Sequence, residues 1–153
     1  NKITMEKFQS KFSLKFTPTN YPVVKIKQSK DAFMCALNYY GDDILIYESA
    51  YLILLNNANE TLGYVKLSQG GISGTVIDVR LVLKYAIESL ATAVILIHNH
   101  PSGRLIASDA DKNITKKIQS ALKLIEISLL DHLIVTSVGF LSFADEGLLT
   151  FEI

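Results

Sequence analysis

The sequence has little of several features that define common classes of protein. Its single cysteine, Cys35, cannot form a disulfide within the chain, and such sparse cysteine is typical of the reducing cytoplasm. No apolar run reaches the ~18 residues that a membrane-spanning helix needs, and no apolar signal segment follows the first residues. Repeats and low-complexity segments are also missing. We therefore expect a cytoplasmic protein without a membrane partner. Because Asn1 is not a methionine, residue 1 need not be the natural start.

The chain does contain enough apolar sequence for one globular domain. Its 153 residues are 49% hydrophobic, which is enough to bury a core and too much for a disordered chain. Cys35 falls within a helix-like segment, so we interpret it as a core thiol rather than as a nucleophile.

The charge of the chain is balanced in total and uneven along its length. The net charge is zero, yet residues 1–30 carry seven lysines and one acid, a charge of +6, which leaves −6 for residues 31–153. A basic arm of this kind can contact nucleic acid in binding that weakens steeply with salt. It can equally fold back on the acidic body of its own chain. A nucleic-acid contact would depend on the lysines near the start: Lys2, Lys7, Lys11 and Lys15.

Hydrophobic periodicity and turn residues predict the elements of the chain. We expect residues 1–28 to form a basic arm, with one short strand in its first part and an edge strand over residues 23–26, and residues 29–153 to form the folded domain. Within that domain the predicted elements are a helix over 30–40 with Ser29 as its N-cap, strands over 47–55 and 61–67, a helix over 79–90 capped by Asp78, a strand over 93–97, a helix over 108–124, and strands over 127–135 and 140–143. This order predicts an α/β protein in which helices flank a mixed β-sheet.

Ligand-type residues follow the apolar strand over residues 93–97. His98 and His100 are two apart, so in an extended chain both side chains point to one face. Ser108 and Asp111 are three apart in a predicted first helical turn and share one side of that helix. Two imidazoles and one carboxylate suit Zn²⁺ and leave a fourth position for water.

Each part of this stretch also has a structural interpretation. Ser108-x-x-Asp111 fits a helix capping box, in which serine caps the first turn and the acid bonds back to it. Residues 101–103, Pro-Ser-Gly, are ordinary turn residues. Only the order and close spacing of all the parts favour a site.

The string His98-x-His100-Pro101, followed after six residues by Ser108-x-x-Asp111, resembles the JAMM (MPN+) metalloprotease motif. Residues 98–103, His-Asn-His-Pro-Ser-Gly, resemble its RadC branch, whose members have long been labelled DNA repair proteins. Similarity extends to residues 93–98, 129–135 and 140–147, and covers about residues 29–150. The chain departs from the family in having Ala107 where proline is usual. It also lacks the Gly-containing pattern of the N-terminal helix-hairpin-helix module of full-length RadC proteins.

The resemblance implies the JAMM/MPN (cytidine-deaminase-like) architecture and a zinc-dependent hydrolase of peptide or isopeptide bonds acting on a protein or peptide. It implies that the zinc ligands are His98, His100 and Asp111, and that Ser108 donates to the oxyanion. The general base would be Glu48, at the start of the strand over 47–55. Its rival, Glu60, lies in a predicted hairpin turn. The substrate stays open.

Two further polar residues receive structural interpretations. His132 lies in an apolar strand and is expected to be a buried histidine with satisfied hydrogen bonds, with support of the site from behind as the alternative. Asn99, between the two histidines, should point to the opposite face and stabilise the turn. Two other functions stay open at this point, a nucleic-acid-associated DNA repair module and a non-catalytic interaction domain. The sequence leaves the oligomeric state undetermined.

Overall fold

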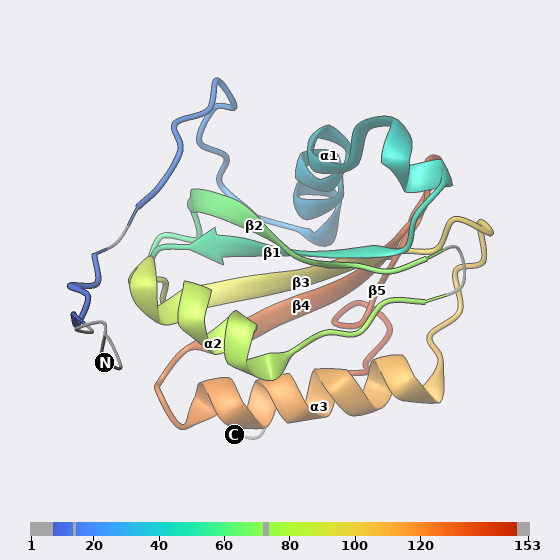
Figure 1. Ribbon diagram of the computed structural model, residues 1–153. Helices are drawn as coiled ribbons and strands as arrows, with labels where there is room; N and C mark the ends of the chain where they lie inside the picture. The colour runs from blue at the N-terminus through green and yellow to red at the C-terminus, as the bar shows by residue number, and fades with distance from the viewer. Residues whose placement is uncertain (1–7, 14, 72–73, 150–153) are drawn as a thin grey trace, which may run out of the picture.

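The computed structural model of the protein describes residues 8–13, 15–71 and 74–149 (Figure 1). Its α-helices and strands follow the predicted order, with bounds that move by a few residues, and the 3-10 helix η1 (Gly41–Leu45) is an element that was not predicted. In chain order the elements are α1 (Ser29–Tyr40), η1, β1 (Ser49–Leu55), β2 (Thr61–Gln69), α2 (Val79–Glu88), β3 (Ala93–Asn99), α3 (Asp109–Lys123), β4 (Ser128–Val135) and β5 (Phe140–Ser142).

The strands form one mixed sheet in the order β2-β1-β3-β4-β5. The β3–β4 pair is parallel, and the other neighbouring pairs are antiparallel. Helix α1 covers one face of the sheet, and α2 and α3 cover the other (Figure 1). This arrangement confirms the predicted α/β fold with a mixed sheet flanked by helices.

Strands β1 and β3 are buried along their whole length, because helices cover both faces of the sheet. Alternation then assigns each side chain to a face. Leu52 and Leu96 lie in the core formed with α2 and α3, whereas Ile53 and Ile95 lie in the core formed with α1. The same alternation directs His98 toward α3 and the next residue, Asn99, toward α1 and η1.

The register of the sheet brings distant segments to the end of β3. Strands β1 and β3 are antiparallel, with Ala50 opposite His98, so the residues just before β1 lie beside the last residues of β3. The loop over residues 100–108 then returns the chain to the start of α3, which packs against the same face. The fold therefore places the start of β1, the end of β3 and the start of α3 at one edge.

The N-terminal arm forms less regular structure than predicted. Its described residues, 8–13 and 15–28, contain no strand, and the predicted edge strand over 23–26 is reduced to a single bridge between Lys25 and Glu60. This bridge meets the β1–β2 turn rather than a strand, so the pairing ends after one residue pair. Lys2 and Lys7, on which a nucleic-acid contact was expected to depend, lie outside the described residues.

The first helix begins differently from the prediction. Its N-cap is Gln28, not Ser29, because the Asp31 carboxylate accepts hydrogen bonds from the backbone N–H groups of Lys27 and Gln28 at 2.8 and 3.2 Å. The Ser29 hydroxyl instead donates to Asp145. Cys35 is buried in the core under α1, as predicted. No helix in the part of the chain that the structure describes is long and apolar enough to cross a membrane.

Candidate metal centre

Two imidazole nitrogens face each other where β3 ends. The Nε2 atoms of His98 and His100 are 3.0 Å apart, with His98 buried and His100 partly exposed. The Nδ1 atom of His100 is 2.7 Å from the backbone carbonyl of Arg104. Because a carbonyl only accepts, His100 must carry a proton on Nδ1, and a neutral ring then has its lone pair at Nε2, directed at His98.

Asp111 brings a carboxylate to the same point from the first turn of α3. Its Oδ1 is 3.3 Å from His98 Nε2, and its Oδ2 is 3.9 Å from His100 Nε2. The capping box is also present: Ser108 N–H donates to Asp111 Oδ2 at 2.8 Å, and Asp111 N–H donates to Ser108 Oγ at 3.1 Å. The structural and functional interpretations of this pair are thus compatible, since the cap orients the carboxylate that meets the histidines.

The surroundings of Asp111 hold it in the ionised form. Burial by itself would raise the pKa of this carboxyl group. The contacts with His98 and the hydrogen bonds from Ser108 outweigh burial and lower the pKa well below its usual value. A carboxylate that stays charged is the form that a metal ion binds.

Glu48 completes the group from the residue just before β1. One oxygen of Glu48 and one nitrogen each of His98 and His100 all lie within 4.8 Å of one another. The Glu48 backbone is held on both sides, because its N–H donates to Gly71 and its carbonyl accepts from Gly70. At Gly70 a Cβ atom would lie 1.6 Å from the Gly74 carbonyl oxygen, so the loop beside Glu48 requires glycine there.

The rival carboxylate, Glu60, lies at the far end of β1. It follows the turn after Leu55, whereas Glu48 precedes Ser49. A strand of this length spans roughly 20 Å at about 3.3 Å per residue, so Glu60 cannot reach the histidines.

Asn99 does more than the turn stabilisation that the sequence predicted. Its side chain is fully buried and points away from the two histidines, as expected. The amide oxygen accepts from Ser49 N–H at 2.8 Å, and the amide nitrogen donates to the carbonyls of Ile44 and Tyr47 at 2.9 and 2.7 Å. These bonds fix the backbone on both sides of Glu48. The only sequence signal for this role was a polar residue at the end of an apolar strand.

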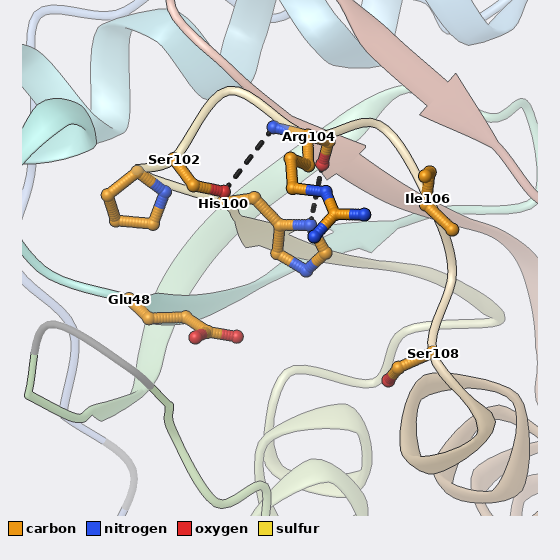
Figure 2. Close-up of a pocket in the computed structure, with 7 residues that line it drawn as sticks. Glu48, His100, Ser102, Arg104, Ile106 and Ser108 are labelled. Carbon is orange, nitrogen blue, oxygen red and sulfur yellow. Dashed lines mark hydrogen bonds between the residues drawn. The ribbon is translucent and has the colours of Figure 1, made fainter.

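The group opens onto two pockets that share Glu48. The larger, about 540 Å³, is shown in Figure 2, where Glu48 and Ser108 approach from opposite sides and His100 lies between them. Arg104 and Ile106 contribute a cation and an apolar side chain to its wall. The smaller, about 220 Å³, is lined by His98, Asp111 and apolar residues of the 75–77 segment and α3. A substrate could therefore reach the candidate centre from solvent.

His132 lies behind His98 and outside the convergent group. It is fully buried in β4, its Nε2 is 2.7 Å from His98 Nδ1, and its ring stacks on Phe143. Burial lowers the pKa of His132 well below its usual value, which keeps the ring neutral. The prediction of a buried histidine with satisfied hydrogen bonds is confirmed, and the contact with His98 adds the support from behind that was its alternative.

The donor set fits a divalent metal ion. Ligand bonds of about 2.0–2.2 Å in a tetrahedral site place ligand atoms roughly 3.3 Å apart. The nitrogen–nitrogen separation of 3.0 Å and the nitrogen–oxygen separations of 3.3 and 3.9 Å bracket this value. Two sets of residues could hold the ion: His98 and His100 with Asp111, or the same histidines with Glu48.

Comparisons with known proteins agree with this geometry. Residues 26–148 match the sequence model of the RadC-like JAB domain. A UPF0758 protein of Flavobacterium johnsoniae is 48% identical over 124 residues, which cover 81% of this chain and 53% of the relative. A UPF0758 protein of Porphyromonas gingivalis is 45% identical over 103 residues, covering 67% of this chain and 45% of the relative. The UPF0758 protein YfjY of Escherichia coli is 44% identical over 102 residues, covering 67% and 64%. The chain spans about half the length of the first two relatives.

Proposed function

Because this chain belongs to the RadC-like JAB domain family, we propose that it is a zinc-dependent hydrolase of peptide or isopeptide bonds. One observation carries the proposal: Glu48 lies within 4.8 Å of the paired nitrogens of His98 and His100, on the segment that the sheet register brings beside them. A site that only binds a metal needs the ligands alone, whereas a hydrolytic site also needs a general base close to them.

We assign Asp111 as the third ligand and Glu48 as the general base. Both Asp111 oxygens lie within ligand-to-ligand distance of a histidine nitrogen, and its capping bonds fix its orientation. Glu48 lines the larger pocket beside His100 and Ser108, where it can meet both a water molecule and a substrate. Its position leaves the fourth ligand position for water.

When bound by His98, His100 and Asp111, zinc would lower the pKa of water and polarise a carbonyl group. Glu48 would take the proton of the attacking water and then give it to the leaving amine. The Ser108 hydroxyl accepts from Asp111 N–H, and Ser108 lines the larger pocket together with Glu48 and His100. From that position the hydroxyl group would donate to the oxyanion of the tetrahedral intermediate.

Metal binding separates the two assignments. Wild-type protein should bind one zinc ion per chain, measured by elemental analysis after dialysis against a weak chelator. Asp111→Asn should lose this ion, and Glu48→Gln should keep it, since the base is not a ligand. Glu60→Gln is the matched control, with a carboxylate removed at the far end of β1. Loss of zinc from Glu48→Gln would reassign Glu48 as a ligand, and a folded wild type that takes up no zinc would overturn the proposal.

Hydrolysis is tested with a set of synthetic peptides, linear and lysine-branched, followed by mass spectrometry. Zinc-loaded wild type should cleave a subset of them, and Glu48→Gln should cleave none while keeping its metal. Absence of cleavage by the zinc-loaded wild type across the set would favour the non-catalytic interaction domain instead. The described lysines of the arm are exposed, and nucleic-acid contact through them stays a prediction.

A further inference from the structure

A buried polar pair, Thr115 and His132, lies behind the candidate centre and is not used by the proposed mechanism. Thr115 is on α3, one helical turn after Asp111, and His132 is on β4; their exposed fractions are 1% and 0%. Thr115 Oγ1 lies 2.6 Å from the Asp111 backbone carbonyl and 2.6 Å from His132 Nδ1, and His132 Nε2 lies 2.7 Å from His98 Nδ1. The pair therefore connects two of the proposed ligands.

The contact between Thr115 and Asp111 decides where the protons lie in the series of hydrogen bonds that runs from Asp111 through Thr115 and His132 to His98. A carbonyl oxygen can only accept, so the one hydroxyl hydrogen of Thr115 must point at the Asp111 carbonyl. Without that hydrogen, two oxygen atoms would face each other at 2.6 Å with no proton between them. Thr115 Oγ1 then has only lone pairs left for its second contact, so His132 Nδ1 must be the donor there.

The remaining positions follow in order. A neutral imidazole carries one proton, so His132 with Nδ1 protonated offers a lone pair at Nε2. This lone pair accepts from His98 Nδ1–H, and a neutral His98 ring then has its own lone pair at Nε2, aimed at the centre. The Arg104 carbonyl imposes the same state on His100. Two lone pairs 3.0 Å apart, beside a carboxylate, call for a cation between them.

We infer that Thr115 and His132 are positioning residues that hold His98 in the tautomer able to bind a metal ion. The inference rests on the proposed metal site and adds a buried element to it. The other tautomer of His98 would place a proton on Nε2, which would donate to His100 Nε2 and close the centre with an N–H···N hydrogen bond. The Thr115 hydroxyl group is what disfavours that alternative.

Thr115→Val tests the inference, because valine has nearly the same shape and lacks only the hydroxyl group. Without an acceptor at its Nδ1, His132 can carry its proton on Nε2 and donate to His98, which then carries a proton on its own Nε2. Loss of a hydrogen-bond partner behind a metal ligand weakens metal binding by about 10–100-fold, and we expect about 10-fold for this variant. Thr115→Ser restores the hydroxyl and should bind zinc within about threefold of wild type. Zinc dissociation constants from competition with a chromogenic chelator measure both.

Nitrogen NMR of the metal-free protein reads the tautomer directly. In long-range 1H–15N spectra recorded well above the usual histidine pKa, wild-type His98 should be protonated at Nδ1, and Thr115→Val should move the proton toward Nε2. Equal zinc affinity of the Val and Ser variants, or His98 protonated at Nε2 in the wild type, would overturn the inference. A wild type that binds no zinc would instead overturn the proposed function, and the tautomer measurement would still decide this inference.

Discussion

His98 and Asn99 are neighbours at the end of β3, and their side chains serve opposite faces of the sheet. His98 faces α3, where it meets His100, Asp111 and His132. Asn99 faces η1, where it binds the backbone of the segment that carries Glu48. One residue step along a strand therefore separates the proposed metal ligands from the bonds that hold the proposed base.

This difference shows that the site consists of two halves with different dependence on the fold. The metal half lies in one stretch from His98 to Asp111, with its ligands two residues apart or fixed by a capping box. The base half depends on the β1–β3 register and on a buried amide that saturates three backbone groups. Substitutions at the two neighbouring residues should accordingly fail in different ways.

His98→Ala should have the largest effect and should act on the metal half alone. Removing one of three ligands, together with the partner of His132, should weaken zinc binding by at least about a thousandfold, or about 4 kcal/mol. Zinc should then no longer raise the thermal midpoint of unfolding, whereas wild type gains about 2.7 kcal/mol at a concentration of 100 times its dissociation constant. Undiminished thermal stabilisation of His98→Ala by zinc would contradict the ligand assignment.

Asn99→Leu should affect the base half by lowering the free energy of unfolding. Leucine fills a similar space but leaves the Ser49 N–H and the carbonyls of Ile44 and Tyr47 without their partner. An unsatisfied buried backbone group costs about 1–3 kcal/mol, and partial relaxation should hold the total loss in the free energy of unfolding to about 2–3 kcal/mol. Urea unfolding of the metal-free protein measures it.

The same variant should keep its zinc affinity near that of wild type, because the ligands lie on the other face. The rate of peptide hydrolysis by this variant should fall, because Glu48 is displaced. Equal losses of zinc affinity in Asn99→Leu and His98→Ala would show that the two halves are not separate.

Ala107→Pro should have the smallest effect. It changes the loop of the metal half, just before the Ser108 cap. Ala107 precedes the Ser108 cap, its N–H makes no hydrogen bond within the described residues, and proline is usual there in the family that the motif resembles. Proline restricts the unfolded chain, so the free energy of unfolding should rise by about 0.4–1 kcal/mol with zinc affinity unchanged. A drop in stability would show that the loop needs a backbone angle that proline does not allow.

Much of the fold could be predicted because its signals are local. The apolar runs of β1 and β3, the caps at Asp78 and Ser108, and the turn residues between elements are read within a few positions. Errors occurred where a tertiary contact competes with a local signal. The Ser29 hydroxyl donates to the distant Asp145 while Gln28 takes the N-cap position, and the β1–β2 turn limits the expected edge strand to one bridge at Lys25.

The sequence by itself determined which residues form the proposed metal half, because His98, His100, Ser108 and Asp111 follow one another on one strand end and one helix start. Only the tertiary structure decided the rest. The antiparallel register of β1 and β3 places Glu48 beside the histidines and Glu60 at the far end of β1, a separation that the sequence pattern does not give. The parallel pairing of β4 with β3 brings His132 against His98, and the packing of α3 adds Thr115. Proton positions depend on such distant contacts, so no reading of the motif alone could have assigned them.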